Sequence, residues 1–87
     1  MSGMRLCVVS NSGGSAFRAF FHLAGIHPSN VLLLTDRPCG IEVFARDNSI
    51  QHVRLEGLDN QAFSDQAARH IDRFGRVDVV LLFFMRL

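Results

Sequence analysis

The sequence has few cysteines, no basic run and no long apolar stretch. Its two cysteines, Cys7 and Cys39, lack CxxC spacing and further ligands nearby, which argues against structural zinc. Without a secretory signal, they are expected to be reduced thiols of a cytoplasmic protein. The nine cationic residues are spread along the chain and the net charge is only +1, so nucleic acid is not an expected partner. The longest apolar run, residues 77–85, is about half the length of a membrane-spanning helix, so no bilayer span is expected.

What the sequence does contain is the composition of a folded protein. Hydrophobic residues make up 48% of the chain and charged residues 20%, a balance typical of a globular core. A chain of 87 residues fits one domain or part of one, and a chain of this size buries only about 60% of its unfolded surface. We therefore expect residues 1–87 to form a single unit of marginal stability.

Short apolar runs alternate with segments whose apolar residues recur at helical spacing. The expected strands are 6–9, 31–34, 51–55 and 77–84, and the expected helices are 16–24, 40–48 and 60–74. The polar–apolar alternation of 51–55 is typical of an edge strand with one wet side, whereas 31–34 and 77–84 have the continuous apolar character of buried strands. Asp59 is the expected N-cap of the last helix, and a stripe of phenylalanines is expected in the core.

This order predicts the fold class. Each crossover between strands is long enough to hold a helix, and parallel connections are right-handed. The sequence therefore predicts an α/β fold in which a Rossmann-like parallel sheet of about four strands, ordered 3-2-1-4, is flanked by helices.

The loop after the first strand is the main candidate for a binding site. Gly13, Gly14 and Ser15 join a parallel strand to a helix, where backbone N–H groups meet the positive end of the helix dipole. The loop is neither a full GxGxxG fingerprint nor a Walker A motif, which would need a Lys-Ser/Thr pair. Locally, phosphate binding and a purely structural need for a sharp turn explain these glycines equally well.

Both ends of the chain resemble one family. Residues 6–15, L-C-V-V-S-N-S-G-G-S, are similar to the first strand and S-G-x-G-S-type loop of glycinamide ribonucleotide formyltransferases. Residues 79–87, V-V-L-L-F-F-M-R-L, resemble that family's fourth strand, which ends in G-F-M-R-I/L beside the folate pocket. L-T-D-R at 34–37 and F-S-D at 63–65 fall near the family's second strand and its later helix opening, so the resemblance covers essentially the whole chain.

The resemblance implies a function and a set of site residues. Gly13, Gly14, Ser15 and Ala16 would bind the phosphate of a small-molecule ribonucleotide, and Met85, Arg86 and Leu87 would border formyl-tetrahydrofolate. The parent protein would transfer a formyl group to an amine acceptor such as glycinamide ribonucleotide in purine biosynthesis. Two positions depart from the family: Ala16 stands where it has Asn, and Phe83 where it has Gly before Phe-Met-Arg. Relatives formylate amino sugars, hydroxyornithine or methionyl-tRNA, which leaves the acceptor open.

The resemblance also places catalysis outside this chain. The family's catalytic Asn and His lie in an N-x-H-P-S run that would follow Leu87, with a catalytic Asp later still. The chain is thus expected to be the amino-terminal part of a formyltransferase domain, truncated and inactive alone, with no catalytic residue of its own. Its apolar edge at 77–84 would pair with a second copy or with the missing carboxyl-terminal part. The copy of most of this motif at 25–29, G-I-H-P-S, falls opposite the ligand crevice, so His27 is predicted to be an exposed turn residue.

Other readings remain open at this stage. Asp36 follows the second strand, where dinucleotide-binding domains place a ribose-binding acid, and it carries the rival hypothesis of a nicotinamide cofactor. His22, His52 and His70 lack metal-ligand spacing and are expected at or near the surface. The alternative to a formyltransferase is a non-catalytic Rossmann-like nucleotide-binding or interaction module.

Overall fold

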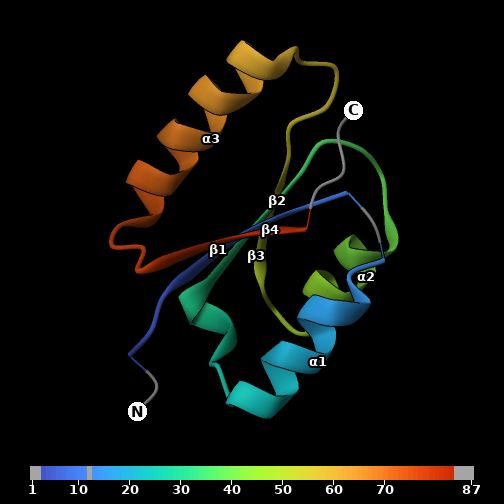
Figure 1. Ribbon diagram of the computed structural model, residues 1–87, viewed down its shortest axis with the longest axis vertical. Coiled ribbons are helices and arrows are strands. Elements are labelled where there is room, and N and C mark those ends of the chain that lie inside the picture. Colours follow the sequence, from blue (N-terminus) through green and yellow to red (C-terminus); the bar gives the residue numbers. More distant parts are fainter. Residues whose placement is uncertain (1–2, 12, 84–87) are drawn as a thin grey trace.

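The computed structural model describes residues 3–11 and 13–83, which form a four-stranded sheet covered by three helices (Figure 1). The strands are β1 (Leu6–Ser10), β2 (Val31–Thr35), β3 (Gln51–Arg54) and β4 (Val79–Phe83). The helices are α1 (Ser15–Ala24), α2 (Gly40–Asp47) and α3 (Asn60–Phe74), with a 3-10 turn η1 (Pro28–Asn30) before β2. All strand pairs are parallel and the order is β3-β2-β1-β4. The predicted fold class and strand order are confirmed.

Strand β1 is the centre of this topology. Its first residue, Leu6, is in register with Val31 of β2 and Val79 of β4. Its last residue, Ser10, is in register with Thr35 and Phe83. From β1 the chain builds outward to β2 and β3, then returns to the other side of β1 with β4. The direction of winding therefore reverses at β1, and the carboxyl end of β1 is the usual ligand-binding edge of such a sheet.

Alternate side chains of β1 enter two separate cores. Leu6 and Val8 point toward α1 and α2, and Cys7 and Val9 point toward α3. Figure 1 shows α3 on one face of the sheet and the other two helices on the opposite face. Because both faces are covered, the inner strands β1 and β2 are buried along their whole length and are apolar except for their last residues, Ser10 and Thr35.

Phenylalanines fill the core between α1 and α2. Phe17 is fully buried, and its ring centroid lies 5.8 Å from that of Phe21 and 6.1 Å from that of Phe44. Phe83 of β4 packs on the same side, 6.4 Å from Phe17. On the other face, Phe63 of α3 is buried against β1 and β2. The predicted aromatic core is confirmed.

Two strands differ from expectation in their exposure. The run 77–84 takes the sheet-edge position that the predicted strand order gives it, but the prediction of a buried strand was wrong, because the side chains of Val80 and Leu82 in β4 are 49% and 70% exposed. Residue 84 lies outside the described residues. Strand β3 is the expected edge strand on the other side, but its polar face is only partly open to water: α2 packs beside it and His52 is half-buried there, whereas the side chain of Arg54 is 43% exposed. In the described part of the chain, no helix has the length and apolar character needed to cross a membrane.

One glycine controls how α1 meets α2. Gly14 precedes α1, is buried and has φ of 72°, a left-handed conformation that side chains rarely adopt. A Cβ built on Gly14 would lie 2.5 Å from Cδ1 and 2.7 Å from Cγ1 of Ile41 on α2. Ile41 is itself fully buried, so neither side can move without disturbing the core.

This contact predicts a large difference between two glycine substitutions. Gly14→Ala should combine about 1–2 kcal/mol of backbone strain with about 1–3 kcal/mol of overpacking against Ile41. Gly25→Ala is the matched control, because Gly25 ends the same helix with φ of 62° but has open space around its Cβ position. Urea unfolding should show a clearly greater loss of stability for Gly14→Ala, and equal losses would mean that the contact with Ile41 does not constrain the fold.

Candidate functional site

The predicted phosphate loop lies at the carboxyl end of the central strand. Strand β1 ends at Ser10 and α1 begins at Ser15, so only a short turn separates them. Gly13, Ser15 and Ala16 are exposed, which places three of the four predicted phosphate-binding residues at the surface together. Gly14 is buried against Ile41, so its missing side chain serves the packing of the two helices.

The amino terminus of α1 has the electrostatic character of an anion site. Its N-cap is Gly14, which supplies no side-chain hydrogen bond, and the first turn contains no acidic residue. The first N–H groups of an α-helix have no partner within the helix, and the helix dipole adds partial positive charge there. The residues that offer these N–H groups, Ser15 and Ala16, are exposed. The N–H groups at this end of α1 can therefore donate hydrogen bonds to an anion.

The amino terminus of α2 lies beside the same loop but is already neutralised. A Cβ built on Gly40, the first residue of α2, would lie 3.3 Å from Cα of Gly13. Glu42 caps this helix, with its Oε1 accepting a 3.4 Å hydrogen bond from the backbone N–H of Cys39. A carboxylate in the first turn compensates the helix dipole. Of the two adjacent helix starts, only that of α1 lacks such an acid.

Arg18 is a component of this region that sequence reasoning missed. It is half-buried in the first turn of α1, and its Nη2 donates a 3.2 Å hydrogen bond to the backbone oxygen of Gly40. Its guanidinium lies over the ring of Phe44, 5.3 Å from the centroid. The sequence does indicate that Arg18 could belong to the site, since it stands one helical turn after the loop. Its orientation toward α2 depends on tertiary packing that the sequence does not show.

Asp36, the candidate ribose ligand, has its carboxylate engaged within the protein. Its side chain is only 6% exposed, and Arg37 donates to both carboxylate oxygens, from Nε at 3.1 Å and from Nη2 at 3.4 Å. This hydrogen bonding, together with the carboxylate's charge, raises the pKa of Arg37. A ribose hydroxyl would have to displace Arg37 from a nearly buried acid.

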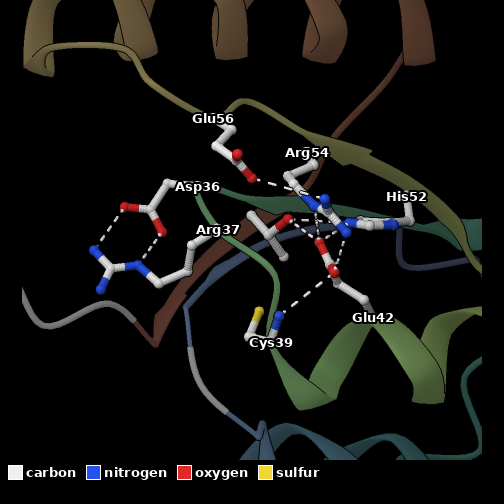
Figure 2. A network of polar contacts seen from close by, with 8 residues as sticks. Asp36, Arg37, Cys39, Glu42, His52, Arg54 and Glu56 are labelled. Atoms are coloured by element: carbon white, nitrogen blue, oxygen red, sulfur yellow. Dashed lines mark hydrogen bonds and ion pairs between the residues drawn. The ribbon is translucent and has the colours of Figure 1, made fainter.

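A cluster of polar side chains surrounds Glu42, between α2 and the ends of β2 and β3 (Figure 2). Arg54 donates to both carboxylate oxygens of Glu42, from Nε at 2.9 Å and from Nη2 at 2.8 Å. The hydroxyl of Thr35 donates to Oε2 at 2.8 Å, and Nε2 of His52 lies 3.0 Å from the same oxygen. Figure 2 places Glu42 at the centre of these contacts, with the pair of Asp36 and Arg37 to one side.

This cluster is an ion-pair network, although it contains a hydroxyl, an imidazole and a carboxylate. Thr35 is fully buried, and its hydroxyl donates to Glu42, whose lowered pKa makes it a weak base. The same imidazole nitrogen of His52 faces both Thr35 and Glu42, at 3.0 Å each, whereas a hydrolytic triad uses the two ring nitrogens separately. His52 is half-buried as predicted, but its contact with Glu42 was not foreseen.

The environment of Glu42 strongly favours its ionised form. The pKa of this carboxyl is lowered from 4.5 to about 2, mainly by the hydrogen bond from Arg54. Partial burial acts in the opposite direction, and the contacts from Thr35 and His52 add to the lowering. Glu42 therefore carries a stable negative charge near neutral pH.

The histidine of the G-I-H-P-S segment behaves as a turn residue. His27 is exposed and precedes η1, at the amino end of β2, so it lies at the opposite edge of the sheet from the loop. Its Nδ1 accepts a 3.1 Å hydrogen bond from the backbone N–H of Ser29. The prediction for His27 is confirmed, and His22 and His70 are exposed and half-buried, as expected.

The remaining candidates give no reactive centre among the described residues. Burial raises the pKa of Cys7 to about 11, and burial is also the main cause that raises the pKa of Cys39, so both thiols stay protonated near neutral pH. The described part of the chain has no group of three or more His, Cys, Asp and Glu side chains that could hold a metal ion.

The predicted folate-binding residues Met85, Arg86 and Leu87 lie outside the described residues.

Comparison with known proteins identifies no relative of this chain. No family model matches the chain, and no curated protein matches it.

The Glu42 network predicts a specific pH dependence of stability. Because the folded-state pKa of Glu42 lies below its ordinary value of 4.5, its contribution should be complete above about pH 4.5 and lost as the pH falls to about 2. Glu42→Gln should cost on the order of 2 kcal/mol at pH 7 and should remove this part of the acid sensitivity. Urea unfolding from pH 7 to pH 2 measures both effects.

The matched control is Glu56→Gln, which removes an exposed carboxylate 3.7 Å from the same Arg54. Exposed ion pairs contribute about 0–1 kcal/mol, so this variant should keep the stability and the pH dependence of the wild type. Similar losses for both substitutions would contradict the central role of Glu42.

Proposed function

We propose that this chain is the phosphate-binding part of a formyltransferase, in which the loop 13–16 holds the phosphate of a ribonucleotide. The parent reaction would transfer a formyl group from formyl-tetrahydrofolate to an amine acceptor such as glycinamide ribonucleotide. The observation that carries the binding role is the position of the loop, which brings an uncapped helix terminus to the carboxyl end of the central strand. The formyl-transfer role rests on the resemblance of residues 6–15 and 79–87 to the formyltransferase family.

The arrangement of the loop suits a phosphate in three respects. Gly13 is exposed and has no heavy atom within 4 Å of its Cβ position, so a ligand can approach its backbone. Ser15 adds a hydroxyl beside the backbone N–H groups of the first turn of α1. The adjacent cation Arg18 raises the local positive potential.

The rival nicotinamide hypothesis is less well supported. It requires Asp36 to accept hydrogen bonds from the ribose hydroxyls. Both of its carboxylate oxygens, however, already accept hydrogen bonds from Arg37, and its side chain is nearly buried. Within the formyltransferase proposal, by contrast, Asp36 has no contact with the ligand.

The proposed role for this chain is to bind and orient a substrate. The loop would fix the phosphate end of the acceptor, so that the amine end extends along the carboxyl edge of the sheet between β1 and β4. Proton transfer belongs, by the resemblance, to the family's N-x-H-P-S run. His27 is not a substitute for it, because it lies at the opposite edge of the sheet.

The proposal predicts that ribose 5-phosphate binds at the loop. In NMR titrations of the labelled protein, amide shifts should change at residues 13–16, with weak binding on the order of millimolar. Gly13→Ala should weaken this binding several-fold, because its methyl group would cover the backbone, while open space at this site should leave stability unchanged.

Asp36→Ala and a titration with NAD provide the control. The formyltransferase proposal predicts that Asp36→Ala binds ribose 5-phosphate as well as the wild type. Binding of NAD that disappears in Asp36→Ala would overturn the proposal in favour of a dinucleotide site. Absence of any shift at residues 13–16 with ribose 5-phosphate would also overturn it.

A further inference from the structure

Arg18 is held beside the loop by packing and by a single hydrogen bond. Its Nη2 donates to the backbone oxygen of Gly40 in an exposed contact. A Cβ on Gly40 would lie 3.8 Å from that same Nη2 and 3.3 Å from Cα of Gly13. The outer end of the guanidinium is therefore close to the backbone of the loop. The planar group also lies over Phe44, which restricts its orientation.

The guanidinium of Arg18 lacks a counter-charge among the described residues. Its side-chain contacts are the carbonyl of Gly40 and the ring of Phe44, and neither carries a negative charge. In contrast, Arg37 and Arg54 are each paired with a carboxylate. The Nε of Arg18 is also buried without a hydrogen-bond partner. Because this nitrogen is buried, a ligand could not reach it, and only the Nη atoms of Arg18 are available for contact with one.

We propose that Arg18 is the residue that makes the loop selective for a phosphomonoester dianion. This inference rests on the proposed function and names the charge state of the ligand that the site selects. The accessible Nη end of Arg18 would contact one phosphate oxygen while the N–H groups at the start of α1 contact the others. A guanidinium matches the geometry of phosphate oxygens, and its bonds to a charged acceptor are among the strongest hydrogen bonds in proteins.

A neutral sugar would gain little binding energy from Arg18. Helix N–H groups and the hydroxyl of Ser15 can bind any acceptor, but a cation without a counter-charge stabilises a negatively charged acceptor much more than a neutral one. The second pKa of a phosphomonoester is about 6, so the dianion predominates at pH 7.5 and the monoanion at pH 5. Selection through charge therefore predicts tighter binding at the higher pH.

The test compares Arg18→Gln and Arg18→Lys with the wild type, using ribose 5-phosphate and ribose as probes at pH 5 and pH 7.5. Amide shifts at residues 13–16 report binding. Arg18→Gln should bind ribose 5-phosphate about tenfold more weakly at pH 7.5 and lose most of the pH dependence. Arg18→Lys, which keeps the charge but lacks the guanidinium that lies over Phe44, should be intermediate. Arg69→Gln, an exposed substitution on α3 at the opposite face, should bind as the wild type does.

The outcomes separate this inference from the proposed function. If the wild type binds ribose 5-phosphate and Arg18→Gln binds it equally well, Arg18 has only a packing role and the inference is wrong, while the proposed function stands. If the wild type shows no binding, both fail together. Should Arg18→Gln not fold, Arg18→Lys decides, because wild-type affinity and pH dependence in that variant would contradict the proposed contact between the guanidinium and a phosphate oxygen.

Discussion

The close approach of Gly14 to Ile41 is the contact on which the candidate site depends. It lets α1 begin directly above the end of β1 while α2 packs against it, so that both helix starts converge on one short loop. A side chain at position 14 would separate the helices or displace Ile41 from a fully buried position. The glycine is thus required by the packing of two helices, and the exposed backbone around Gly13 is a consequence of that packing.

Charge is distributed unequally between the two helix starts. The acid in the first turn of α2, Glu42, has its oxygens engaged by Arg54, Thr35 and His52. The first turn of α1 contains a cation, Arg18, and no acid. The Glu42 network stabilises the join between α2 and β3, whereas the start of α1 has positive charge without internal compensation. This asymmetry distinguishes a structural cluster from a candidate binding site within the same edge of the sheet.

Most of the fold could be predicted from the sequence, because the spacing of apolar residues and the position of turn-forming residues determine helices and strands through neighbouring residues alone. The bounds of α3 and its Asp59 cap, which accepts from the N–H of Ala62 at 2.8 Å, follow from such signals. The place of β4 at the sheet edge follows from the predicted strand order, but the exposure of its Val80 and Leu82 side chains could not be predicted, since an apolar run does not reveal how far a helix covers its face. The site was predicted in part. The loop follows from its glycines, but the contact of Arg18 with Gly40 and the pairing of His52 with Glu42 join residues distant in sequence.

The most direct test is a crystal structure of the protein with ribose 5-phosphate at saturating concentration. The account predicts a phosphate group over the start of α1, within hydrogen-bond distance of the backbone N–H groups of Ser15 and Ala16, with Nη atoms of Arg18 on one of its oxygens. A phosphate bound instead at Arg54, or in the turn around His27, with the loop left empty, would contradict it.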